Sequence, residues 1–124
     1  MAKPGSVIGW TLDAGERAAL LERYPPRYAE VVAHHVTLAT DAENRALPGR
    51  IRAEIVGRAD DGLGLEAMVV TADGDTARPD GSTFHITWSL GEGRRARESN
   101  DLLTQHGWTE LERPVPIMLT PARI

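Results

Sequence analysis

RIRAEIVGRADDGLGLEAMVVT, the stretch from residue 50 to residue 71, decides the fold that we expect. In residues 50–58 an apolar side chain occupies nearly every second position, which is the pattern of a strand with one buried face. Asp61-Gly62 is a typical hairpin turn, and the apolar residues 63–71 after it predict the partner strand. The stretch therefore predicts an antiparallel hairpin.

Further strands are expected on both sides of this hairpin. Residues 28–39 (YAEVVAHHVTLA) and 83–90 (TFHITWSL) contain β-branched and aromatic side chains, which favour strands. Residues 108–119 predict a last strand that contains prolines, and we expect it at a sheet edge because proline cannot donate a ladder hydrogen bond.

Two short helices complete the predicted elements. Residues 13–23 predict a helix that Asp13 caps and the Pro25-Pro26 pair ends. Residues 99–106 predict a second helix, closed by Gly107. One helix, four strands, a helix and a final strand, with hairpin connections, predict an α+β fold with an antiparallel sheet in one domain. That domain spans residues 1–124.

The composition narrows the function classes. With 41% hydrophobic and 26% charged residues, the chain resembles an ordinary globular protein, and its lack of cysteine excludes disulfides, thiolate nucleophiles and zinc fingers. A net charge of −4 argues against a long footprint on nucleic acid, although Arg94, Arg95 and Arg97 form a local basic cluster. Residues 1–17 lack the apolar segment of a secretory signal, and no apolar run could cross a membrane. We therefore expect a cytoplasmic monomer without a membrane partner.

Two similar motifs carry the candidate chemistry: His35-Val36-Thr37-Leu38 and His85-Ile86-Thr87-Trp88. Alternate residues of a strand point to the same face, so each motif presents an imidazole beside a hydroxyl. The second residue of each motif then packs on the opposite face. The same alternation predicts that His34 points away from His35. Brought together, the motifs would place two imidazoles and two hydroxyls on one face.

Such a set suits cleavage of a phosphodiester. Histidine titrates near neutral pH, so one imidazole can accept a proton from water while the other protonates the leaving oxygen. Threonine hydroxyls can bind the phosphate oxygens, and this chemistry requires no metal and no cofactor. Two alternatives remain open. The histidines are structural, or His34, His35 and His85 bind a metal, which would need a bulge in the first strand.

The two motifs resemble the paired signature of the 2H phosphoesterase superfamily. The segment at residues 98–103 (ESNDLL) is similar to the corresponding segment in the cyclic phosphodiesterase domain of fungal and plant tRNA ligases. The resemblance implies two lobes of antiparallel sheet related by a pseudo-twofold axis, with short helices on the outside. It also implies hydrolysis of a 2′,3′-cyclic phosphate, on an RNA 3′ end or a small nucleotide, to a 2′-phosphate. It favours His85 as the base and His35 as the acid.

The expected site follows from these observations. Its catalytic residues are His35 and His85, and its phosphate-binding residues are Thr37, Thr87, Ser99 and Asn100, while Arg94 and Arg97 are possible substrate contacts. Ser99 and Asn100 also suit the start of a helix, where free amides bind anions. Trp88 is expected in the core and His106 at a helix end. Two other functions remain open: cleavage of 2′–5′ or cyclic oligonucleotide linkages, and nucleotide binding without catalysis.

Overall fold

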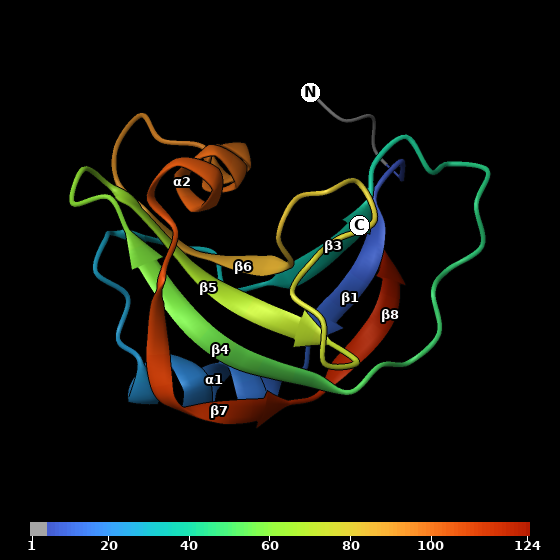
Figure 1. Ribbon diagram of the computed structural model, residues 1–124, viewed down its shortest axis with the longest axis horizontal. Coiled ribbons are helices and arrows are strands. Elements are labelled where there is room, and N and C mark those ends of the chain that lie inside the picture. The colour runs from blue at the N-terminus through green and yellow to red at the C-terminus, as the bar shows by residue number, and fades with distance from the viewer. Residues whose placement is uncertain (1–4) are drawn as a thin grey trace.

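The computed structural model describes residues 5–124, which form two antiparallel sheets and two short α-helices (Figure 1). In chain order the elements are β1 (Ile8–Leu12), α1 (Ala14–Arg23), β2 (Glu30–Val31), β3 (His35–Ala39), β4 (Ala53–Asp60), β5 (Leu65–Ala72), β6 (His85–Leu90), the 3₁₀ turn η1 (Ala96–Glu98), α2 (Ser99–His106), β7 (Thr109–Ile117) and β8 (Leu119–Arg123). The α+β class with antiparallel sheets is therefore as predicted. Within residues 5–124, no helix combines the length and apolar character needed to cross a bilayer.

The smaller sheet has the strand order β3-β1-β8, and the larger has the order β2-β6-β5-β4-β7. The predicted hairpin is confirmed, since β4 pairs with β5 from Ala53–Ala72 to Asp60–Glu66. The proline-containing β7 lies at an edge, as predicted. The sequence patterns did not reveal β1, nor the break at Met118 that separates β7 from β8.

The prediction of one unbroken strand over residues 28–39 is wrong. The chain pairs with β6 as far as Ala33, whose amide donates to the carbonyl of Thr87 at 2.9 Å, and from His35 onward it pairs with β1. Ala33 has a φ of 41°, in the left-handed region that non-glycine residues seldom adopt. This residue turns the chain from the larger sheet into the smaller one, so a single segment joins the two sheets.

The main core lies between the two sheets. It includes these buried side chains: Trp10, Leu12 and Val36 of the smaller sheet, and Ile55, Met68, Val70, Ile86 and Trp88 of the larger one. Leu20 of α1 joins this core, whereas Leu102 and Leu103 of α2 pack with Leu65 and Val69 in a second cluster. The two helices thus lie on opposite sides of the larger sheet (Figure 1). Trp88 is buried, as predicted.

Both predicted helices form, and their ends have the expected caps. The Asp13 carboxylate accepts from the amides of Gly15 and Glu16, which satisfies free donors in the first turn of α1. His106 is the last residue of α2, and Gly107 follows it with a φ of 65°. Ser99, the first residue of α2, makes a hydrogen bond to Thr87 of β6, so the first turn of α2 lies close to β6.

Candidate functional site

The path of the chain brings the two His-x-Thr motifs together from different sheets. Glu30 and Val31 pair with Leu90 and Ser89, and the amide of Ala33 bonds to the carbonyl of Thr87, so the chain follows β6 to within two residues of His35, and β3 stays in contact with β6 beyond that point. The charge of His85 acts on His35, which agrees with this placement. Val36 and Ile86 are buried in the main core. The predicted alternation within each motif is therefore confirmed.

His35 contacts the histidine beside it in sequence. The Nδ1 atoms of His34 and His35 lie 3.1 Å apart, and the two rings are nearly perpendicular, with an interplanar angle of 77°. The prediction that His34 points away from His35 is wrong, because the left-handed Ala33 breaks the regular alternation just before them. Burial, and then the charges of His34 and His85, lower the pKa of His35 to about 4.

His85 is fixed by the backbone rather than by a side chain. Its Nδ1 lies 2.8 Å from the carbonyl oxygen of Thr83, and since a carbonyl can only accept, Nδ1 carries the proton. Burial lowers the pKa of His85; the bond to Thr83 opposes that change, and the positive charge of Arg78 adds to it. The Nε2 atom is therefore the one left for proton exchange with a ligand.

The two threonines differ in their partners. The hydroxyl of Thr87 is buried and lies 3.3 Å from the carbonyl oxygen of Ala96 and 3.0 Å from the hydroxyl of Ser99, which is itself buried. The hydroxyl of Thr37 is half-buried and has no hydrogen-bond partner among residues 5–124. Ser99, the first residue of α2, therefore lies next to the second motif. Thr37 presents the hydroxyl that is free to bind a ligand.

Arg78 is a residue of this region that the sequence patterns did not reveal. It lies in the loop between β5 and β6, it is 9% exposed, and its guanidinium donates two bonds to the carboxylate of Asp80. The same group lies 3.5 Å from the side-chain oxygen of Asn100 at the start of α2. Arg78 therefore connects the loop to α2 and brings a positive charge near His85.

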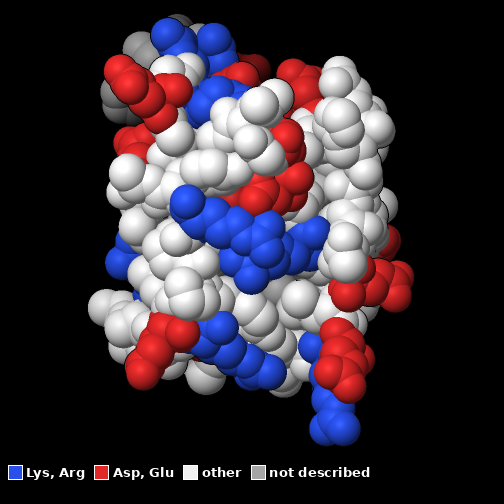
Figure 2. Space-filling model, turned by 90° about the vertical axis from the view of Figure 1, so that its left-hand side faces the viewer, with Lys and Arg blue, Asp and Glu red and all other residues white. Residues whose placement is uncertain are grey.

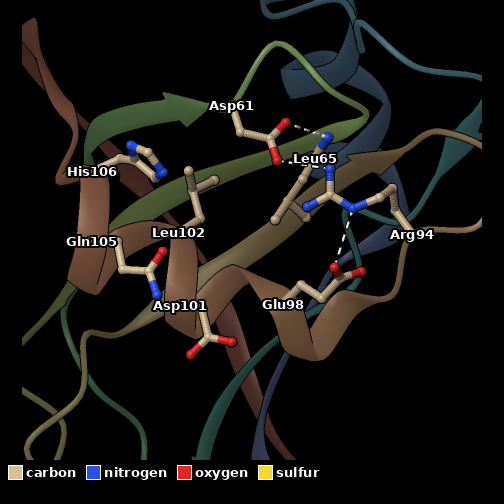
Figure 3. Close-up of a pocket in the computed structure, with 8 residues that line it drawn as sticks. All are labelled: Asp61, Leu65, Arg94, Glu98, Asp101, Leu102, Gln105 and His106. Carbon is tan, nitrogen blue, oxygen red and sulfur yellow. Dashed lines mark hydrogen bonds and ion pairs between the residues drawn. The ribbon is translucent and has the colours of Figure 1, made fainter.

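Arg94 is engaged elsewhere. Its guanidinium pairs with Asp61 at 2.7 Å and with Glu98 at 3.2 Å, in a polar pocket that α2 also lines with Asp101 and His106 (Figure 3). On the side of the molecule that carries the β4–β5 hairpin, positive and negative side chains lie side by side (Figure 2). The charge of Arg94 is thus balanced by carboxylates.

Arg97 lies in η1, and Asn100 lies in the first turn of α2, which follows directly. The side chain of Arg97 is exposed on η1, and its carbonyl oxygen lies 3.5 Å from the side-chain nitrogen of Asn100. Asn100 therefore bridges the backbone of η1 and the guanidinium of Arg78. Asn100, predicted to bind phosphate, is thus linked through Arg78 to the surroundings of His85.

No three or more His, Asp or Glu side chains of residues 5–124 are grouped so that they could hold a metal ion. Comparison of the chain with protein-family models, with curated proteins and with solved structures finds no match. The functional interpretation therefore depends on the geometry of the two motifs.

Proposed function

We propose that this chain hydrolyses a 2′,3′-cyclic phosphate, carried by an RNA 3′ end or a small nucleotide, to a 2′-phosphate and a free 3′-hydroxyl. The observation that carries the proposal is the approach of two His-x-Thr motifs from separate sheets, in which β3 contacts β6 and the charge of His85 acts on His35. In this interpretation each sheet is one lobe of a 2H phosphoesterase-like fold with a pseudo-twofold relation, and each lobe contributes one motif.

Two histidines are sufficient for the proton transfers of this reaction. One neutral imidazole takes a proton from water as the water oxygen attacks phosphorus, and one imidazolium gives a proton to the 3′-oxygen as its bond to phosphorus breaks. Both histidines have a lowered pKa without ligand, so the anionic phosphate itself favours protonation of one of them. No step in this sequence needs a metal ion.

We assign the two catalytic roles from the surroundings of the rings. His35, with a pKa of about 4, is neutral near pH 7 and suits the base. The bond from Nδ1 of His85 to the Thr83 carbonyl favours the protonated ring, so His85 suits the acid. This assignment is the reverse of the one that the family resemblance favours.

The hydroxyl of Thr37 and the cation of Arg78 are the proposed partners of the phosphate oxygens. Thr37 has no other partner among the described residues, and Arg78 keeps a positive charge near His85. The hydroxyls of Thr87 and Ser99 bond to each other, so in this proposal they contribute by exchanging that bond for one to the ligand. Asn100 has a supporting role, as a bridge to Arg78.

The test is turnover of 2′,3′-cyclic AMP and of an RNA oligomer with a cyclic phosphate end, with the product isomer identified by ³¹P NMR. We expect a 2′-phosphate, full activity in excess EDTA, and a loss of about 10²–10⁴-fold for His35→Ala and for His85→Ala. His106→Ala is the matched control, since this exposed histidine ends α2. Absence of turnover by the native protein, loss of activity in EDTA, or equal activity of all three variants would contradict the proposal.

Two further substrates belong in the same assay. A 2′–5′ oligoadenylate and a cyclic dinucleotide would need the same two histidines, so their turnover in place of the cyclic phosphate would redirect the substrate assignment. Tight binding of a nucleotide without turnover would identify a binding module instead.

A further inference from the structure

We propose that His34 is a positioning residue for the reaction proposed above, on which this inference rests. Its Nδ1 accepts the Nδ1–H of His35, and this bond leaves the Nε2 lone pair of His35 free to take the proton from water. Nothing in the sequence pattern assigns His34 this role, because a regular strand would turn its ring away from His35.

The contact between the two rings carries the proposal. Their Nδ1 atoms are 3.1 Å apart, a hydrogen-bond distance, and only one of the two can hold the shared proton when both rings are neutral. If His35 holds it, its Nε2 is bare and can act as a base. If His34 holds it, the neutral ring of His35 carries its own proton on Nε2 and cannot act as a base.

The first arrangement becomes stronger during the reaction. When His35 takes up a proton it becomes an imidazolium, and its Nδ1–H then donates to a neutral acceptor in a charge-assisted bond. His34 is exposed to solvent, whereas His35 is partly buried. His85 of β6 also acts on His35, and its charge lowers the pKa of His35.

The backbone builds this contact at an energetic cost. Ala33, just before the pair, is left-handed with a φ of 41° and is fully buried. Arg17 of α1 donates to the carbonyls of Val32 and Ala33 at 3.1 and 2.9 Å, and the carbonyl of His34 accepts from Leu12 at 3.0 Å. Strained residues that their neighbours hold in place are concentrated at functional sites. Here the strained turn at Ala33 holds the rings of His34 and His35 in contact.

The experiment measures the tautomer of His35 directly. Long-range ¹H–¹⁵N spectra of the full chain, labelled at histidine, distinguish a proton on Nδ1 from a proton on Nε2. Near pH 7 we expect His35 to carry its proton on Nδ1. This readout needs no substrate, so it decides the inference even if the cyclic phosphate proves to be the wrong ligand.

Two variants distinguish the effect of the His34–His35 hydrogen bond from the effect of a side chain that only fills the position of His34. His34→Asn keeps an acceptor near the position of Nδ1, so we expect the tautomer, the pH profile and most of the kcat to be retained. His34→Phe removes the acceptor, and we expect a mixed tautomer, a shifted pH profile and a kcat lower by about 10–100-fold with little change in KM, the scale on which partners that orient an active histidine act. His106→Phe is the matched control.

A proton on Nε2 of His35 in the native protein would overturn the inference. So would a His34→Phe variant with an unchanged tautomer and an unchanged pH profile. By contrast, a native protein that shows the expected tautomer but turns over no cyclic phosphate would contradict the proposed function and leave the His34–His35 bond established.

Discussion

The two His-x-Thr motifs share a sequence pattern, yet the molecule holds them in different ways. His85 bonds to a backbone carbonyl, and Thr87 bonds to the backbone of Ala96 and to Ser99. His35 bonds to an exposed neighbouring side chain, and Thr37 has no hydrogen-bond partner among the described residues. The second motif is therefore fixed by the fold, whereas the first can respond to solvent and ligand.

The position of each motif in its sheet explains part of this difference. β6 lies between β2 and β5 inside the larger sheet, and α2 packs across that sheet near Thr87. Among residues 5–124, β3 is the edge strand of the smaller sheet and pairs there with β1. The side chain of Thr87 finds partners in η1 and α2, which pack beside the interior strand β6, whereas that of Thr37 on the edge strand has no hydrogen-bond partner among residues 5–124. Two motifs with the same sequence pattern thus differ in which of their side chains are available to a ligand.

The largest expected effect concerns stability against pH. His35 has a pKa of about 4 when folded and an ordinary value of 6.5, so as the pH falls through this window the unfolded chain takes up the proton first. This linkage lowers the free energy of unfolding by up to about 3 kcal/mol. We expect His35→Gln to remove most of this loss, as measured by urea unfolding between pH 7 and pH 4.

His85→Gln is the matched variant for that measurement. Burial also lowers the pKa of His85, but the hydrogen bond to the Thr83 carbonyl opposes that change, so its replacement should flatten the pH dependence less. If the two variants flatten the pH dependence of the unfolding free energy equally, the proposed difference between the surroundings of His35 and His85 is wrong.

The next effect concerns the charge near the second motif. Arg78→Gln removes a cation that lowers the pKa of His85, so the pKa should rise and the alkaline limb of the activity profile should move to higher pH. We also expect a rise in KM of about 10–100-fold, because a charge-assisted bond to phosphate is lost. Steady-state kinetics across pH measure both.

Arg78→Lys separates charge from geometry. Lysine keeps the cation but cannot make the two parallel bonds to Asp80, so the alkaline limb should stay near its native position while KM rises. A limb that moves equally in both variants would show that Arg78 acts on His85 through the loop rather than through its charge.

A third comparison concerns the two hydroxyls. Thr87→Val leaves the buried hydroxyl of Ser99 without this partner, and we expect a loss of about 1–3 kcal/mol in unfolding free energy. Thr37→Val leaves no such group, so its stability should change little while kcat falls about 10-fold. Urea unfolding and kinetics on both variants test this difference. The prediction would be wrong if Thr37→Val were less stable than Thr87→Val.

Several features of the fold could be predicted because their signals are local. The Asp13 cap, the Asp61-Gly62 turn and Gly107 after α2 each act within a few residues. The alternation that buries Val36 and Ile86 is also local, since it depends only on strand geometry. These features needed no knowledge of what packs against them.

The features that were missed depend on contacts between distant segments. Alanine has no preference for a left-handed conformation, and Ala33 adopts one because Arg17 and Thr87 hold the backbone around it. Arg78 reads as part of a polar loop until the loop folds back over α2. For β1 a signal existed: Gly9 within a short apolar stretch marks a close approach, since a Cβ there would lie 2.0 Å from the carbonyl oxygen of Val36.

The smallest expected effect is at Arg94, which the sequence suggested as a substrate contact. Asp61, Glu98 and the carbonyl of Leu63 already occupy its guanidinium, and the hydrogen bond to Asp61, followed by the charges of Asp61 and Glu98, raises the pKa of Arg94. A phosphate would have to displace two carboxylates to reach Arg94, whereas Asp80 is the one carboxylate paired with Arg78 among residues 5–124. Arg94→Ala should therefore change kcat/KM for a cyclic phosphate by less than about 2-fold, far below the change at Arg78. A loss of kcat/KM at Arg94 as large as that at Arg78 would contradict this expectation. It would indicate that the phosphate binds near Arg94, and that the polar pocket of Figure 3 is part of the site.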